Sequence, residues 1–224
     1  MDMQTYTDYQ RAVVYTDTPG LADRTAERKA ADAITRALRS SGLRVKLCFV
    51  VHLQYGRVVS QDLATIERVL DSIKVPDVSF GIIINGVDAA VCRTLASDAG
   101  AFKRLVALLN SGNYTTPHVL VIPEIEALVD QDDCVVELPL GVRSTLEQFP
   151  STSLPVESVV AINVDDFSGA VNRIARSVSA LERDEQLLYG AQQQLERKRP
   201  DFWTIAGVAM SVIGTVVKLA IDLL

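Results

Sequence analysis

The sequence AVVYTDTPGLAD, residues 12–23, decides the fold that the rest of the chain is expected to adopt. Its apolar start, residues 12–15, ends in the turn-forming residues 16–20 (TDTPG), and a helical pattern follows. A buried strand that runs into an acidic residue and a glycine predicts a site at the carboxyl edge of a doubly wound α/β sheet. Asp17 suits a hydrated magnesium ion, which prefers hard oxygen ligands, and Gly20 lets a backbone N–H approach a phosphate. The alternative interpretation is a plain strand-to-helix turn.

Outward from this stretch, apolar strand-like runs alternate with helical patterns as far as residue 123. The order β-α-β-α-β-α-β, with short turns, predicts a mostly parallel sheet with helices on both faces. Residues 4–9 are expected to form an edge strand or a hairpin arm, and residues 130–155 are expected to be irregular. The run at residues 44–53 is rich enough in apolar and β-branched residues to predict a strand buried on both faces. The expected strands are residues 12–16, 44–53, 79–85 and 118–123, and the expected helices are residues 21–41, 60–73 with Ser60 as N-cap, and 98–110.

Composition limits the domain number, the type of partner and the cellular location that are expected for the chain. The 224 residues suffice for one α/β domain with an appendage, and the net charge of −6 argues against nucleic acid as the main partner. Cys48, Cys92 and Cys134 are far apart in the sequence, which indicates free thiols in a reducing compartment and no metal site. His52 and His118 are isolated and are interpreted as strand-end residues rather than metal ligands. The N-terminus lacks the apolar segment of a signal peptide, so a cytoplasmic location is expected.

Residues 165–199 carry a helical pattern whose apolar residues recur on alternating steps of three and four. At about 1.5 Å per residue, a helix of this length runs roughly 50 Å. One interpretation is an ordinary terminal helix packed on the domain. The other is a coiled-coil stalk or dimer seam, which would make the protein a homo-oligomer. The apolar seam positions are Val171, Ile174, Val178, Leu181, Leu188 and Leu195, and the polar ones are Glu185 and Gln192.

The C-terminal segment is strongly apolar. Residues 196–200 (ERKRP) form a basic flank, and residues 202–217 are almost wholly apolar. Lys218 lies near the chain end, where a lysine side chain can reach a membrane surface. This pattern favours a tail anchor in an intracellular membrane through residues 202–224, and the alternatives are a buried helix or an amphipathic helix packed in an oligomer. The sequence thus divides into an α/β domain at residues 1–160, a helical stalk at 165–199 and an apolar helix at 201–224.

Three stretches carry a resemblance to a known family. Residues 17–21 (DTPGL) resemble the third motif of the P-loop GTPases. Residues 82–88 (IIINGVD) resemble the strand and guanine-reading N-K-x-D motif of the same proteins, with Gly86 in place of the lysine. Residues 48–62 (CFVVHLQYGRVVSQD) look like the strand, turn and helix start of the septin-related, immunity-associated P-loop GTPases. The resemblance covers roughly residues 11–125 and implies a partial GTPase (G) domain.

The resemblance also implies a guanine-nucleotide site. Asp17 would hold Mg²⁺ through water, Thr18 belongs to the same phosphate-side motif, and Gly20 would contact the γ-phosphate. Asn85 and Asp88 would read the guanine of GTP or GDP. No G-x-x-x-x-G-K-[ST] motif occurs in the sequence, although the family places this P-loop before the DTPG strand.

Two functions are compatible with these features. In the first, the chain is the C-terminal part of a GTPase that binds GTP with Mg²⁺ and hydrolyses it slowly, as a switch for assembly at a membrane. In the second, it is a degenerate, nucleotide-free G domain that serves as a membrane-associated interaction or scaffold module. In both, a sheet without its first strand leaves backbone groups of a neighbouring strand unpaired. Residues 1–160 alone are therefore expected to be marginally soluble or to take up a partner strand.

Overall fold

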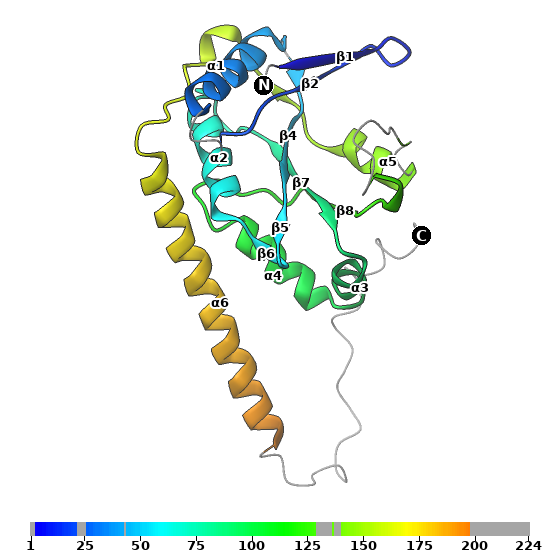
Figure 1. Ribbon diagram of the computed structural model, residues 1–224, viewed down its shortest axis with the longest axis vertical. Helices are drawn as coiled ribbons and strands as arrows, with labels where there is room; N and C mark the ends of the chain where they lie inside the picture. Colours follow the sequence, from blue (N-terminus) through cyan, green and yellow to red (C-terminus); the bar gives the residue numbers. More distant parts are fainter. Residues whose placement is uncertain (1–2, 22–25, 43, 129–135, 137–139, 198–224) are drawn as a thin grey trace.

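The structure of the chain is a computed structural model that describes residues 3–21, 26–42, 44–128, 136 and 140–197. For residues 140 and 185–197 it describes the backbone and not the side chains. The fold is mixed α/β, with a parallel sheet between helices, so the predicted α/β class is confirmed (Figure 1). The apolar helix expected at residues 201–224 lies outside the described part, within which no helix is long and apolar enough to cross a membrane.

The parallel sheet consists of β4 (Leu47–Val51), β7 (Phe80–Val87) and β8 (Val119–Pro123), in the spatial order β4-β7-β8. The central strand β7 pairs in parallel with both neighbours, and Leu47 of β4 lies opposite Phe80. Its sequence FGIIINGV is rich in isoleucine, whose branched side chain suits a pleated, buried surface. The parallel pairing predicted from the alternation of strands and helices is confirmed for these three strands.

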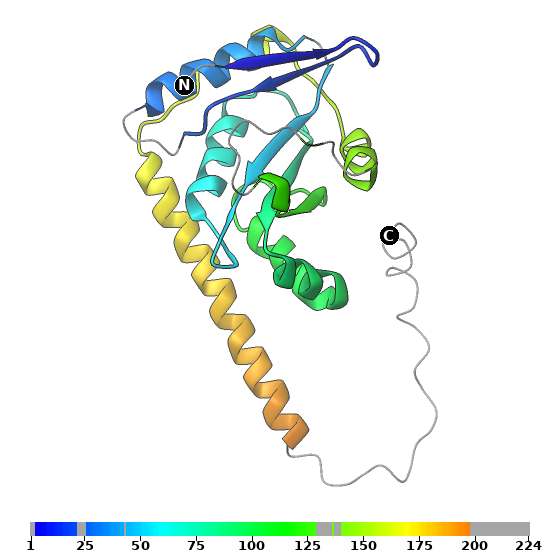
Figure 2. The ribbon, with the colours of Figure 1, turned by 45° about the vertical axis from the view of Figure 1, so that its right-hand side comes forward.

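Helices cover the two faces of the sheet unequally. On one face lie α1 (Glu27–Ser40), α2 (Ser60–Asp71) and α6 (Phe167–Arg197), whose apolar side chains form the main core with alternate strand residues (Figure 1, Figure 2). On the opposite face, α5 (Leu140–Gln148) and the adjacent Phe149 pack on β7 and β8 in a smaller cluster. No cluster of the described residues covers β4 on that side.

Shorter elements connect these layers. The pair α3–α4 follows β7, and two short antiparallel strand pairs flank the sheet. The bounds are Ala89–Ser97 for α3, Ala99–Leu109 for α4, Glu126–Leu128 for η1 and Val156–Ser158 for η2, with β3 (Arg44–Val45) paired to β9 (Thr152–Ser153) and β5 (Leu53–Gln54) paired to β6 (Arg57–Val58).

The N-terminal hairpin corrects the expectation for residues 12–16. A strand forms there, as predicted, but β2 (Val13–Asp17) pairs antiparallel with β1 (Gln4–Asp8) outside the parallel sheet, and every residue of β2 is exposed. The physical reason is local, because the Asp8 carboxylate accepts hydrogen bonds from two backbone N–H groups of the intervening turn. The closed turn gives β2 a partner that is adjacent in sequence. The hairpin arm expected before it is confirmed.

Three further expectations need correction. Residues 44–53 are not one strand buried on both faces, since they divide into β3, β4 and β5, and the β4 residues alternate between the core and the exposed face. Residues 130–155 were expected to be irregular but contain α5 and β9. Helix α2 begins at Ser60, but the N-cap position is Val59, which offers no capping side chain.

Helix α6 confirms the helix predicted at residues 165–199. Ile174 is completely buried and Val178 is buried with it, on the side of α6 that faces α2. The Arg173 guanidinium forms an ion pair with Glu67 of α2, whose carboxylate is also held by a backbone N–H of a neighbouring loop. The first half of α6 is therefore packed on the domain. The seam positions Leu188 and Leu195 have side chains outside the described part.

Candidate functional site

The carboxyl edge of the sheet is formed by the end of β7 and the loop that follows it. Asn85 and Gly86 are exposed there, while Val87 is buried beneath them. Gly86 has φ 67°, in the left-handed region that glycine occupies without strain, so a lysine at this position would cost conformational energy. The Glu124 N–H donates to the Val87 carbonyl oxygen at 2.9 Å and ties the ends of β7 and β8 together.

Asp88 begins helix α3 as its N-cap. Its Oδ1 accepts hydrogen bonds from the N–H of Ala90 at 2.6 Å and of Val91 at 3.4 Å. A carboxylate in this position satisfies helix donors that lack a partner and interacts favourably with the positive end of the helix dipole. The residue predicted to read guanine therefore has a capping role, and both of its bonds end on one oxygen.

The other half of the predicted site lies at the end of the N-terminal hairpin. Asp17 and Gly20 are exposed, and Thr18 is half-buried. Among the described residues, none beyond its chain neighbours lies within 4 Å of the position that a Cβ on Gly20 would take. Leu21, only 1% exposed, inserts into the main core and anchors the turn.

The structure brings Asn85 and Asp88 together but does not bring Asp17, Thr18 and Gly20 to them. In both views the hairpin lies beside α1 at one end of the sheet, and β7 runs into α3 at the opposite end (Figure 1, Figure 2). This separation follows from the pairing of β2 with β1 instead of with the parallel sheet. Among the described residues no group of three or more His, Cys, Asp or Glu side chains could hold a metal ion.

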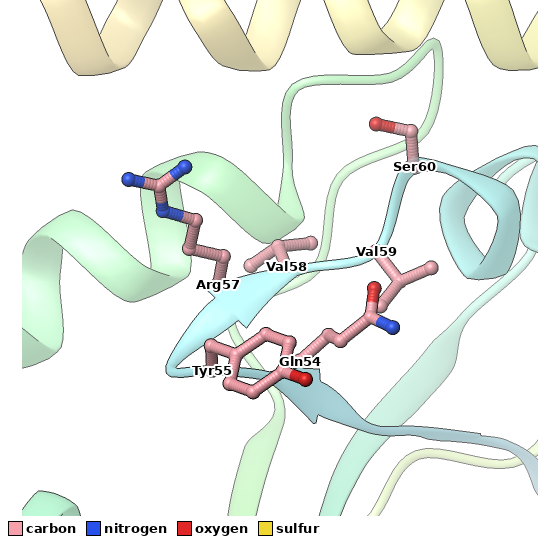
Figure 3. Close-up of a pocket in the computed structure, with 6 residues that line it drawn as sticks. All are labelled: Gln54, Tyr55, Arg57, Val58, Val59 and Ser60. Atoms are coloured by element: carbon pink, nitrogen blue, oxygen red, sulfur yellow. The ribbon is translucent and has the colours of Figure 1, made fainter.

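A second exposed feature is the β5–β6 hairpin, whose turn lies within residues 48–62, where the family resemblance placed a turn. Tyr55 and Gly56 form its two-residue turn with φ 53° and 76°, and the Tyr55 side chain is 98% exposed. Figure 3 shows Tyr55 and Arg57 on opposite sides of the hairpin ribbon, beside a shallow depression that continues to Ser60. The Tyr-Gly pair between two apolar runs is the sequence signal for this turn.

A carboxylate lies where β4 ends. Asp62, in the first turn of α2, accepts a hydrogen bond from the His52 N–H at 3.2 Å through Oδ2. Desolvation raises the pKa of Asp62, and this backbone hydrogen bond opposes the rise only in part. Asp62 forms no ion pair with the described residues. The carboxyl end of β4 therefore carries a partly desolvated negative charge.

Comparisons of the chain with protein-family models, with curated proteins and with solved structures give no match.

Proposed function

We propose that this chain is an interaction module built on a GTPase-like α/β fold, with no nucleotide hydrolysis of its own. The observation that supports this most is the separation of the Asp17–Gly20 segment from Asn85 and Asp88 by the length of the sheet (Figure 1). Phosphoryl transfer depends on magnesium and phosphate ligands held in fixed positions around one bound nucleotide. Two halves at opposite ends of the sheet do not provide that arrangement.

The GTPase-like part of the proposal rests on topology and on one loop. The parallel order β4-β7-β8, with an N-G-x-D sequence after the central strand, is consistent with a partial G domain of the septin-related, immunity-associated type. Ligands of doubly wound sheets bind outside the carboxyl ends of strands, where Asn85 and Asp88 lie.

The interaction part rests on exposed apolar side chains. On the N-terminal hairpin, the side chains of Tyr6, Tyr9, Val14 and Tyr15 are all more than half exposed. Exposed apolar residues gathered on one element favour a contact surface for another macromolecule. In this proposal the module is cytoplasmic and the apolar sequence of residues 202–224 attaches it to an intracellular membrane.

A second candidate function is guanine-nucleotide binding at the carboxyl edge of the sheet, through Asn85 and Asp88. One observation favours it. The Asn85 side chain is exposed beside Asp88, and the two hydrogen bonds of Asp88 use only Oδ1, so the second oxygen is oriented by the cap and can accept from a ligand.

A titration of the full chain with a fluorescent GTP analogue, with and without Mg²⁺, distinguishes the two candidate functions. The interaction module predicts no saturable binding up to about 1 mM nucleotide, which corresponds to less than about 4 kcal/mol of binding free energy. The decisive variant is Asp88→Asn, because asparagine keeps the N-cap and loses the acidic acceptor for guanine. Asp98→Asn is the matched control, since Asp98 caps α4 by accepting from the Gly100 N–H at 2.8 Å. Micromolar binding that Asp88→Asn abolishes and Asp98→Asn preserves would overturn the first proposal.

A further inference from the structure

Strand β4 is an edge strand of the parallel sheet. It pairs with β7, and among the described strands no other one pairs with it. An edge strand presents a row of N–H and C=O groups that can pair with another chain, and proteins usually guard such edges with charges, prolines or bulges. The sequence of β4, LCFVV, contains no charged residue and no proline. It pairs with β7 in continuous register from Leu47 to Val51.

The side chains on one face of β4 are apolar and exposed. Val50 is 57% exposed and Cys48 is exposed beside it, while Val51 is buried in the main core. Helix α5 and Phe149 cover this face over β7 and β8 only. The open edge of β4 therefore adjoins an exposed part of the sheet face, which is formed by Cys48 and Val50.

The two ends of β4 carry opposite charges. Lys46 precedes the strand, where its Nζ donates to the Leu146 carbonyl oxygen at 3.2 Å and to the adjacent carbonyl at the C-terminus of α5. Asp62 lies at the other end, on the His52 N–H. A strand that pairs antiparallel with a copy of itself sets the positive end of each strand beside the negative end of the other. Parallel pairing would set like charges together, which is unfavourable at short range.

We propose that β4 pairs antiparallel with β4 of a second copy of this chain, about a two-fold axis. The register that uses all five residues sets Phe49 opposite Phe49 and Cys48 opposite Val50 of the other copy. Lys46 then lies beside His52 and Asp62 of the second copy. The two three-stranded sheets become one continuous sheet, and a self-complementary patch of this kind is what a two-fold dimer requires.

The electrostatics of Asp62 agree with this occupant. Desolvation raises the pKa of Asp62, and a lysine from the second copy would favour its charged form. The dimer uses no residue of the candidate nucleotide site. The test of the dimer is therefore independent of the test of the proposed function.

The first test is the dimer dissociation constant of the full chain, measured by sedimentation velocity in one mild detergent for all samples. Val50→Lys places a charge on the open edge and is expected to weaken the dimer by about tenfold or more. The matched control is Val156→Lys, because Val156 is 54% exposed in η2, which is not part of the parallel sheet. Wild-type protein and Val156→Lys are expected to dimerise equally, and unchanged circular dichroism would show that both variants fold.

The second test fixes the register. In a Cys92→Ser, Cys134→Ser background, Val50→Cys sets the introduced thiol opposite Cys48 of the other copy, at the roughly 4.5–5.5 Å between Cβ atoms of a cross-strand pair. A short bifunctional thiol reagent is expected to yield covalent dimers with Val50→Cys and none with Val156→Cys. A monomer at all concentrations overturns the proposal. A dimer that survives Val50→Lys, or one that is lost on Leu181→Lys in α6 instead, also overturns it.

Discussion

Strands β2 and β7 are both runs of β-branched and apolar residues, yet β2 is exposed along its length and β7 is buried over most of it. The difference lies in their partners. β7 has a parallel neighbour on each edge and helices on each face, whereas β2 has one antiparallel neighbour and no described element packs over it. The same residue types therefore stabilise the fold at one site and form an exposed surface at the other, because burial depends on layers supplied by distant segments.

The largest expected effect comes from the buried strand. Ile84 of β7 is completely buried, so Ile84→Ala is expected to lower the free energy of unfolding by about 2–5 kcal/mol through lost contacts and a cavity. Val14→Ala on β2 is expected to cost less than about 0.5 kcal/mol, because Val14 is 59% exposed. Urea unfolding of both variants checks the contrast. Equal losses would mean that the hairpin is buried in solution.

A smaller loss of stability is expected from the ion pair that joins α6 to α2. Arg173→Ala leaves the Glu67 carboxylate buried at 3% exposure without its cation and is expected to cost about 1–3 kcal/mol. Arg176→Ala is the control on the same helix, because Arg176 is exposed and, among the described residues, its Nε donates to the Asn172 carbonyl oxygen of its own helix. Urea unfolding would contradict the packed position of α6 if the two arginine variants lost equal stability.

The next largest effect is the pH dependence of stability caused by Tyr114. Desolvation, with a hydrogen bond to Asp71 Oδ1 at 2.8 Å, raises the pKa of Tyr114 from 10.0 to about 12. The unfolded chain releases this proton from about pH 10 upward while the folded chain keeps it, so stability falls between pH 10 and 12. Tyr114→Phe is expected to remove this part of the fall. An identical dependence on pH in wild type and variant, measured by urea unfolding, would contradict the shift.

The smallest effect is expected at the open edge of β4. Because burial raises the pKa of Asp62, its ionisation above the ordinary value of 3.8 destabilises the folded monomer. At concentrations where the chain is monomeric, Asp62→Asn is expected to be slightly more stable than wild type at pH 7. The difference should vanish as the pH falls to 3.8 and below. A variant that is less stable at pH 7 than at pH 4, relative to wild type, would show that the carboxylate is favourably paired.

Much of the sheet could be predicted from the sequence, while the geometry of the candidate site could not. The runs that became β4, β7 and β8 are separated by helical periodicity, and short connections of this kind make parallel neighbours. Helix α3 was not among the predicted helices, so the capping role of Asp88 became apparent only in the structure. The exposure of β2 could not be predicted from the sequence. Its local turn favours pairing with β1, and whether β2 instead joins the parallel sheet is decided only when the whole chain folds.

The sequence by itself determined that strands form at β4, β7 and β8, that helices form at α1, α2, α4 and α6, and which residues carry the family resemblance. These depend on periodicity and capping within a few residues of each position. The tertiary structure decided that the hairpin stays outside the sheet, that α6 packs on α2, and that one edge of β4 is open. Each of these depends on which segments far apart in sequence compete for the same backbone hydrogen bonds and apolar surface, a balance that no local pattern records.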